Sequence, residues 1–231
     1  GVGFAKQGYP VRGLFSIPFE KLDKNGIPVL RNESGQLSST SFNFQERDNT
    51  DFLIYEGPTD PTITGSLGNV FTYKGFRLNV FMTYSFGNVV RLNPVFNAKY
   101  SDLSAMTREF KNRWTLPGDE NVTNIPAIMS ARMYNELSDY AYAYNAYNYS
   151  NVRVAKGDFI RLKEISLSYD FPKNWIKPLL LSNLSLKIQA TNLFLLYADK
   201  KLNGQDPEFF NAGGVASPVP RQFTLTLRLG L

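Results

Sequence analysis

The chain contains neither cysteine nor histidine among its 231 residues. Zinc sites built on these side chains, thiol nucleophiles and histidine-based catalytic triads are therefore excluded. The absence of cysteine also argues against a small secreted domain held together by disulfides. From the sequence we assign no catalytic residue, no metal ligand and no cofactor, and we expect a protein that is not an enzyme.

Long apolar runs are also missing. No segment approaches the roughly 18 consecutive apolar residues of a membrane helix, so membrane helices are excluded. The chain is 43% hydrophobic and 14% aromatic, with a mean hydropathy of -0.25. Membrane strands remain compatible with these values, because a barrel strand needs only about ten residues of alternating character.

The sequence also lacks a cluster of positively charged residues. The net charge is +5 and the isoelectric point is about 9.3, which raises the question of nucleic acid. The basic residues, however, are scattered and form no stripe of the kind that follows a phosphate backbone. We therefore expect no nucleic-acid partner.

The sequence contains several segments in which apolar and polar residues alternate. Residues 223–231 carry an apolar side chain at every odd position and a polar residue or glycine at every even position. This pattern predicts a strand with one apolar side, and Arg228 on its other side points to a barrel with lipid outside and water inside. Five further strands are expected, at 11–19, 67–73, 77–86, 164–171 and 184–190.

The connections between these strands alternate between long and short. Residues 20–66, 87–158 and 197–220 form long connections, whereas Lys74-Gly75 and 172–183 form short ones. An up-and-down barrel in an outer membrane has short periplasmic turns and long external loops, so the C-terminus is expected on the periplasmic side. Six strands cannot close around a lumen. We therefore expect a segment whose edge strands, near Val11 and Phe223, pair with strands outside residues 1–231.

Candidate ligand-binding residues fall into two groups. A tyrosine-rich stretch that includes Tyr140, Tyr142 and Tyr144, together with Trp114, is a candidate platform for sugar rings or peptide side chains. An aromatic girdle at the lipid headgroups, or an ordinary loop cluster, is the alternative interpretation. The second group is the polar side of the strands, where Arg77 and Lys187 are candidate substrate contacts. The other residues expected to face the lumen are Asn79, Lys163, Glu164, Gln189 and Arg228.

Two carboxylates, Asp206 and Glu208, flank a proline. They are too few for a calcium site, so we expect a turn with solvated charges.

Several motifs occur in an order that resembles one known family. The segment 156–172, KGDFIRLKEISLSYDFP, resembles a signature near the C-terminus of SusC/RagA-like TonB-dependent transporters of Bacteroidetes. ATNLF at 190–194, DPE at 206–208 and PRQFTL at 220–225 are similar to later motifs of the family. Upstream, YKGF at 73–76, RW at 113–114, PG at 117–118 and IP at 125–126 resemble earlier ones. The final residue, Leu231, departs from the aromatic residue on which the family usually ends.

The resemblance implies that residues 1–231 are the C-terminal part of an antiparallel, all-β transmembrane barrel of about 22 strands with long extracellular loops. The plug domain and the N-terminal strands would lie elsewhere in the polypeptide. It further implies an active importer of oligosaccharides or peptides in the outer membrane of a Gram-negative bacterium. The implied partners are the rest of the barrel with its plug, a SusD-like surface lipoprotein, TonB, the substrate and outer-membrane lipid.

Two alternatives remain open on the sequence. The first is a passive porin or adhesin barrel, which would lack a plug and act without TonB. The second is a soluble β-sandwich that binds glycans through the tyrosine cluster.

Overall fold

The computed structural model describes residues 5–46, 48–100, 106–136, 139–210 and 218–231. The predicted connections 20–66, 87–158 and 197–220 each fall partly outside these ranges. The chain divides into two compact units, which are treated separately below. Residues 61–87, 157–199 and 205–231 form what we call the sheet unit. Residues 1–60, 88–156 and 200–204 form the loop unit.

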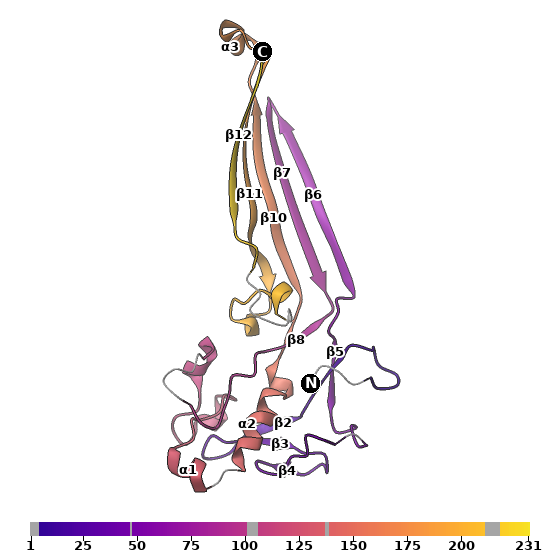
Figure 1. The fold of residues 1–231 in the computed structure, drawn as a ribbon, viewed down its shortest axis with the longest axis vertical. Coiled ribbons are helices and arrows are strands. Elements are labelled where there is room, and N and C mark those ends of the chain that lie inside the picture. Colours follow the sequence, from indigo (N-terminus) through magenta and orange to yellow (C-terminus); the bar gives the residue numbers. More distant parts are fainter. Residues whose placement is uncertain (1–4, 47, 101–105, 137–138, 211–217) are drawn as a thin grey trace. The chain divides into compact units, whose positions relative to one another are not determined.

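The sheet unit contains one long antiparallel sheet (Figure 1). Its five strands lie in the order β12-β11-β10-β7-β6. Their bounds are β6 (Ile63–Tyr73), β7 (Phe76–Phe86), β10 (Phe159–Asp170), β11 (Asn183–Ala198) and β12 (Gln222–Gly230). Strands that are neighbours in this unit's sequence are also neighbours in the sheet, which is the meander of an up-and-down barrel wall.

Short and long connections lie at opposite ends of this sheet. Lys74 and Gly75 join β6 to β7, with positive φ angles of 45° and 85°. The β10–β11 connection holds α3 (Lys173–Ile176) and the 3-10 helix η4 (Lys177–Leu179). The pairs Ile63↔Phe86 and Phe159↔Ala198 mark the other end, from which the long connections leave. The predicted alternation of loop lengths therefore holds for these five strands.

The predicted sixth strand at 11–19 is not part of the long sheet, so the six-strand count is not confirmed. This segment divides into β1 (Gly13–Ser16), which pairs with β5 (Ile54–Pro58), and the start of β2 (Phe19–Leu22), which pairs with β3 (Pro28–Arg31). Pro18 lies between them and interrupts the run, because proline cannot donate to a strand ladder. Within the described residues the first edge of the long sheet is β6, and the edge predicted near Val11 is corrected accordingly.

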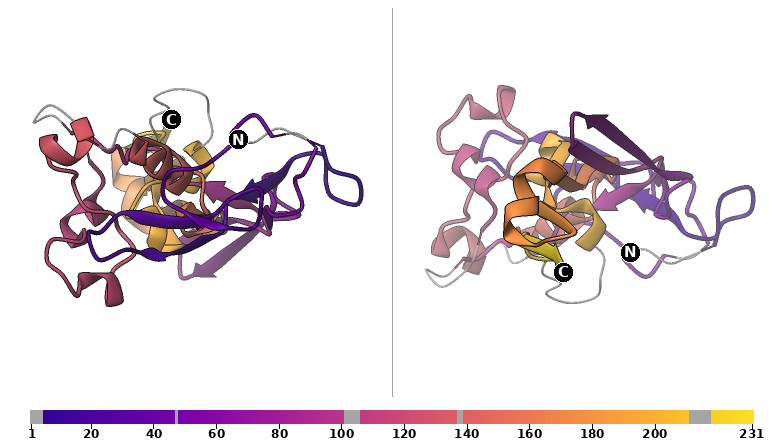
Figure 2. Two further views of the ribbon diagram at one scale, coloured as in Figure 1. Left: turned by 90° about the horizontal axis from the view of Figure 1, so that it is seen from below. Right: turned by 90° about the horizontal axis from the view of Figure 1, so that it is seen from above.

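The loop unit is built from short elements. Besides the β1–β5 pair it contains the β2-β3-β4 sheet, with β4 at Leu37–Ser38, and the pair β8 (Val89–Arg91) and β9 (Val154–Lys156). Figure 2 shows the β2–β3 hairpin from two further directions. The helices of the loop unit are α1 (Ala131–Glu136), α2 (Tyr140–Asn148), and the 3-10 helices η1 (Arg108–Asn112), η2 (Asp119–Asn121), η3 (Asn151–Arg153) and η5 (Lys200–Leu202). In the sheet unit, η6 spans Pro207–Phe209.

The core of the loop unit consists of two clusters of buried side chains, and α2 contributes to both. One buried cluster contains Ile27, Ala98, Met129, Ala143 and Tyr144. A second contains Phe96, Ile125 and Tyr147. Beside it, the guanidinium of the fully buried Arg153 lies 4.8 Å from the Phe96 ring centroid and pairs with Glu109. No helix in the described part of the chain is long and apolar enough to cross a membrane.

The turn between β2 and β3 requires a glycine. Gly26 has a φ of +73°, and its amide donates to the Asp23 carbonyl oxygen at 2.9 Å. A Cβ at this position would lie 2.6 Å from the Trp114 ring and 2.7 Å from the Ala127 Cβ. The positive φ and the close packing therefore both disfavour any other residue.

Replacing Gly26 by alanine is expected to lower the free energy of unfolding of the loop unit by about 2–5 kcal/mol, the sum of a left-handed backbone cost and overpacking. The matched control is Gly35→Ala, because Gly35 has a similar φ of +76° but nothing within 4 Å of the added carbon. The control should lose about 1–2 kcal/mol. Amide hydrogen exchange of peptides covering residues 19–38 in the full-length protein measures both, and equal losses would contradict the packing argument.

Candidate functional site: the two faces of the long sheet

The register of the long sheet assigns its side chains to two faces. Directly paired residues of antiparallel strands point to the same side, and successive residues point to opposite sides. The row Leu78↔Leu167↔Ile188↔Leu225 therefore shares one face. The row Asn79↔Ser166↔Gln189↔Thr224 shares the other. We call these the apolar face and the polar face.

The apolar face is exposed in the sheet unit. Ile188 is 54% exposed, Leu225 70% and Leu227 58%, and Leu67 on β6 is 58% exposed. In a soluble sandwich these side chains would be covered by a second sheet. No described residue of the sheet unit supplies such a cover.

Aromatic residues border the apolar face at both ends. At the turn end, Tyr73 and Tyr169 are both paired with Phe76. At the end with the long connections, Ile160 is paired with both Tyr84 and Tyr197. Phe76 and Tyr84 are eight residues apart, or about 27 Å along the strand. A strand inclined by about 40° would cover about 21 Å of membrane thickness over this length, close to the apolar band of a transmembrane barrel.

Three irregularities in β10 and β11 keep the apolar side chains on one face. One is a register shift at Leu196, between the pairs Ile160↔Tyr197 and Arg161↔Leu195. In β10 the register shifts between Leu162 and Glu164, so that Lys163 is the extra residue of a bulge. In β11, Asn192 has a φ of 54°, and the register shifts there as well. Each extra residue resets the alternation, because a bulge places two residues opposite one. As a result Leu162 and Ile165 lie on the same face although they are three positions apart.

The polar face carries several of the predicted lumen residues. Asn79, Glu164 and Gln189 lie on it, and the Asn79 side-chain amide donates to Glu164 at 3.2 Å. Arg77 and Lys187 are both paired with Ser168, one from each neighbouring strand. Arg228 is paired with Ser185, one step nearer the turn end. The structure therefore brings Arg77 and Lys187 into one row.

An ion-paired cluster near the other end of the polar face is a correction to the sequence prediction. Asp206 is not a solvated turn residue: its side chain is only 9% exposed, and both of its oxygens accept from Arg161 Nη2 at 2.6 Å. Glu208 is the half-exposed second partner of Arg161, at 3.2 Å. Asp206 also caps η6 by accepting from the Glu208 amide. The cluster holds the start of the β11–β12 connection to β10.

The tyrosines of the predicted aromatic platform do not share one exposed surface in the loop unit. Tyr140, Tyr142 and Tyr144 lie on α2, where Tyr140 and Tyr144 are one turn apart and face the core. Tyr144 is 1% exposed, and its hydroxyl donates to the Ala127 carbonyl at 2.7 Å, while burial raises its pKa. Tyr142 is 50% exposed and lies 6.3 Å from Phe44, measured between ring centroids. A role of these residues in substrate binding stays a prediction.

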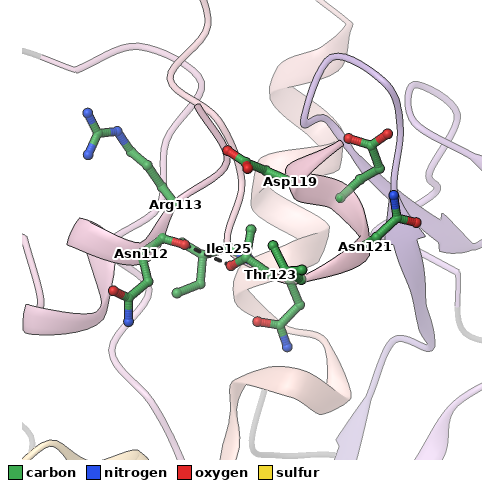
Figure 3. Close-up of a pocket in the computed structure, with 9 residues that line it drawn as sticks. Asn112, Arg113, Asp119, Asn121, Thr123 and Ile125 are labelled. Atoms are coloured by element: carbon green, nitrogen blue, oxygen red, sulfur yellow. Dashed lines mark hydrogen bonds between the residues drawn. The ribbon is translucent and has the colours of Figure 1, made fainter. Parts of the chain in front are cut away.

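Trp114 adjoins a polar pocket of the loop unit. Its indole N–H donates to Glu120 at 2.9 Å, and Glu120 lines an open pocket of about 710 Å³ (Figure 3). Hydrogen bonds from Trp114 and from nearby amides hold the pKa of Glu120 below its usual range. Donors at Leu116 and Thr115 do the same for the pKa of Asp119. Figure 3 shows the Thr123 hydroxyl turned toward the Asn112 carbonyl, to which it donates at 2.8 Å.

With both faces described, the chain can be compared with known proteins. No protein-family model matches it. It is 26% identical over 205 residues to TonB-dependent receptor P39 of Formosa agariphila, covering 86% of this chain and 17% of the relative. It is 27% identical over 163 residues to TonB-dependent receptor P3 of the same organism, covering 71% of this chain and 14% of the relative. The chain thus spans less than a fifth of the length of these relatives.

Solved structures give the same result for the fold. A chain of the RagAB peptide transporter superposes with a TM-score of 0.66 at 21% identity, over 97% of this chain and 23% of that chain. The RagAB peptide importer in its "open-open" state gives a TM-score of 0.63 at 19% identity, with the same coverage. The resemblance to SusC/RagA-like TonB-dependent transporters is confirmed, and the fold is that of a segment of a transporter barrel.

Replacing Asp206 by asparagine keeps the shape of the side chain but leaves the largely buried Arg161 with only a half-exposed partner. We expect the β11–β12 connection to lose about 2–3 kcal/mol of local stability. Glu208→Gln is the matched control and should cost less than about 1 kcal/mol, since that carboxylate is well solvated. Amide hydrogen exchange of peptides covering residues 205–210 measures the difference. Equal exchange in the two variants would rule out the Arg161–Asp206 pair as the anchor.

Proposed function

We propose that this chain forms part of the wall of an outer-membrane active transporter that imports oligosaccharides or peptides. The two-faced sheet is the observation that carries the proposal. Its apolar face, bordered by aromatic rows, suits contact with lipid, and its polar face suits a water-filled lumen. The proposed mechanism is transport, with no catalytic step assigned to this chain.

The edges of the sheet support a larger barrel. Among the described residues, β6 and β12 each pair with one neighbour only. Unpaired backbone groups are too costly in hydrocarbon for either edge to face lipid. We infer that both edges pair with further strands of the same barrel, which encloses a plug.

The remaining parts of the machinery come from the relatives. Two are named TonB-dependent receptors, and the similar structures are of a peptide importer, RagAB. By analogy we propose energisation through TonB and a SusD-like lipoprotein partner at the cell surface. The short β6–β7 and β10–β11 connections and the C-terminus would then face the periplasm, and the long connections would be extracellular.

The two alternatives make different demands on the structure. A soluble glycan-binding sandwich needs a covered apolar face, which the exposure of Leu225 and Ile188 disfavours. A passive porin or adhesin would use the same wall, so only the energy requirement of transport separates it from our proposal.

A lysine at Leu225 should destabilise the membrane-inserted protein by about 2–3 kcal/mol, because it puts a charge on the lipid face. Thr224→Lys is the matched control: it adds the same charge one residue away, on the polar face, and should change stability by less than about 0.5 kcal/mol. Equilibrium unfolding of the full-length protein in phospholipid vesicles measures both. A Thr224→Lys variant as unstable as Leu225→Lys would contradict the assignment of the faces.

Transport should depend on TonB. Cells that carry the full-length gene are expected to accumulate radiolabelled oligosaccharides or peptides from a mixed panel, and deletion of the gene or of tonB should abolish accumulation. Uptake that continues without TonB would identify a passive pore. Recovery of the full-length protein in the aqueous fraction without detergent would instead favour the soluble sandwich.

A further inference from the structure

Three cations lie close together on the polar face near its turn end. Arg77 and Lys187 flank Ser168 from the two strands next to β10, so their Cα atoms are about 10 Å apart. Lys187 is paired with Thr226, and Arg228 lies two residues farther along β12, toward the turn end. We call Arg77, Lys187 and Arg228 the cationic row.

The cationic row is poorly compensated by negative charge within the described residues. None of its three side chains forms an ion pair there, in contrast to Arg161 on the same face, which has two carboxylate partners. Asp170 is the nearest described carboxylate, paired in register with Ser185, which in turn is paired with Arg228. One carboxylate against three cations leaves an excess of positive charge that a low-dielectric wall concentrates.

The residues around the cationic row are small and hydrophilic. Ser168 and Thr226 are paired in register with Arg77 and Lys187. The adjoining row carries Asn79, Ser166, Gln189 and Thr224. Across β7, β10, β11 and β12 neither row has an aliphatic or aromatic side chain, and on β6 the two rows continue into Thr72 and Val70. Hydroxyl and amide groups beside free cations suit a hydrated ligand that binds and leaves.

We propose that the cationic row binds soluble ligands that carry several carboxylate groups, and that the transported substrate is of this anionic kind. Ammonium and guanidinium groups donate charge-assisted hydrogen bonds to carboxylates, and the spacing of about two strand widths between Arg77 and Lys187 fits acidic groups along an oligomer. This inference rests on the proposed transport function, since it requires the polar face to line a lumen.

Binding of fluorescein-labelled hexaglutamate to the purified full-length protein in detergent tests the proposal. The wild type should bind hexaglutamate at least tenfold more tightly than hexaglutamine, and raised salt should weaken that binding. Combining Arg77→Gln, Lys187→Gln and Arg228→Gln should lower the affinity about threefold for each charge removed. The matched control is Lys173→Gln, which removes an exposed charge at the same end of the sheet but in α3, and which should leave the affinity unchanged. A labelled oligogalacturonate provides the same chemistry on a sugar.

The outcomes separate the explanations. Binding of either polymer that is lost in the triple variant and kept in Lys173→Gln supports the proposal. Binding of neither polymer, or binding that the triple variant retains, overturns it. Unchanged affinity with a lower thermal midpoint in the triple variant would assign the row to another part of the polypeptide and also overturn it. TonB-dependent uptake of neutral compounds, measured separately, would persist if only this inference fails.

Discussion

The sheet unit depends on one constraint: the side chains of an extended strand alternate between two faces, and pairing keeps that alternation in step from strand to strand. A shift of one residue in any of its five strands would move apolar side chains to the polar face. The register keeps Leu78, Leu167, Ile188 and Leu225 together across four strands. Every feature assigned to this unit, from the aromatic borders to the cationic row, follows from the common register of the strands.

The same constraint explains which strands could be predicted from the sequence. The terminal strand alternates without interruption, and the predicted 223–231 agrees with β12 (Gln222–Gly230) to within one residue at either end. The strand predicted at 164–171 is longer in the structure, beginning at Phe159, and the one predicted at 184–190 continues to Ala198. In both cases the alternation breaks at a bulge, at Lys163 or near Asn192, and a reset of the alternation resembles the end of a strand.

The loop unit could not be predicted in this way, because its structure depends on burial rather than on local pattern. The segment YAYAYNAYN is interpreted from the sequence as a platform, an aromatic girdle or a loop cluster, yet it forms the helix α2. A helix of nine residues has little stability of its own, so packing of Ala143 and Tyr144 against Ile27 and Met129 determines its conformation. Tertiary contacts of this kind leave no periodic signal in the sequence. The interpretation of the tyrosines as a group failed to distinguish the buried Tyr144 from the exposed Tyr142.

The cationic side chains discussed above fall into two groups, one buried and one exposed to solvent. Arg153 and Arg161 are buried and paired with carboxylates, and Arg91 donates to the Phe15 carbonyl at 2.7 Å and to Ser16 Oγ at 3.0 Å. Burial lowers the pKa of Arg91 to about 10, so its guanidinium remains charged at neutral pH and those acceptors are needed. A buried cation without partners would be strongly destabilising. Arg77 and Arg228 are exposed and Lys187 is partly exposed, so water solvates them at little cost. Charges in such a position contribute little to folding, and their energetic effect is greatest on an anion that reaches them from solution.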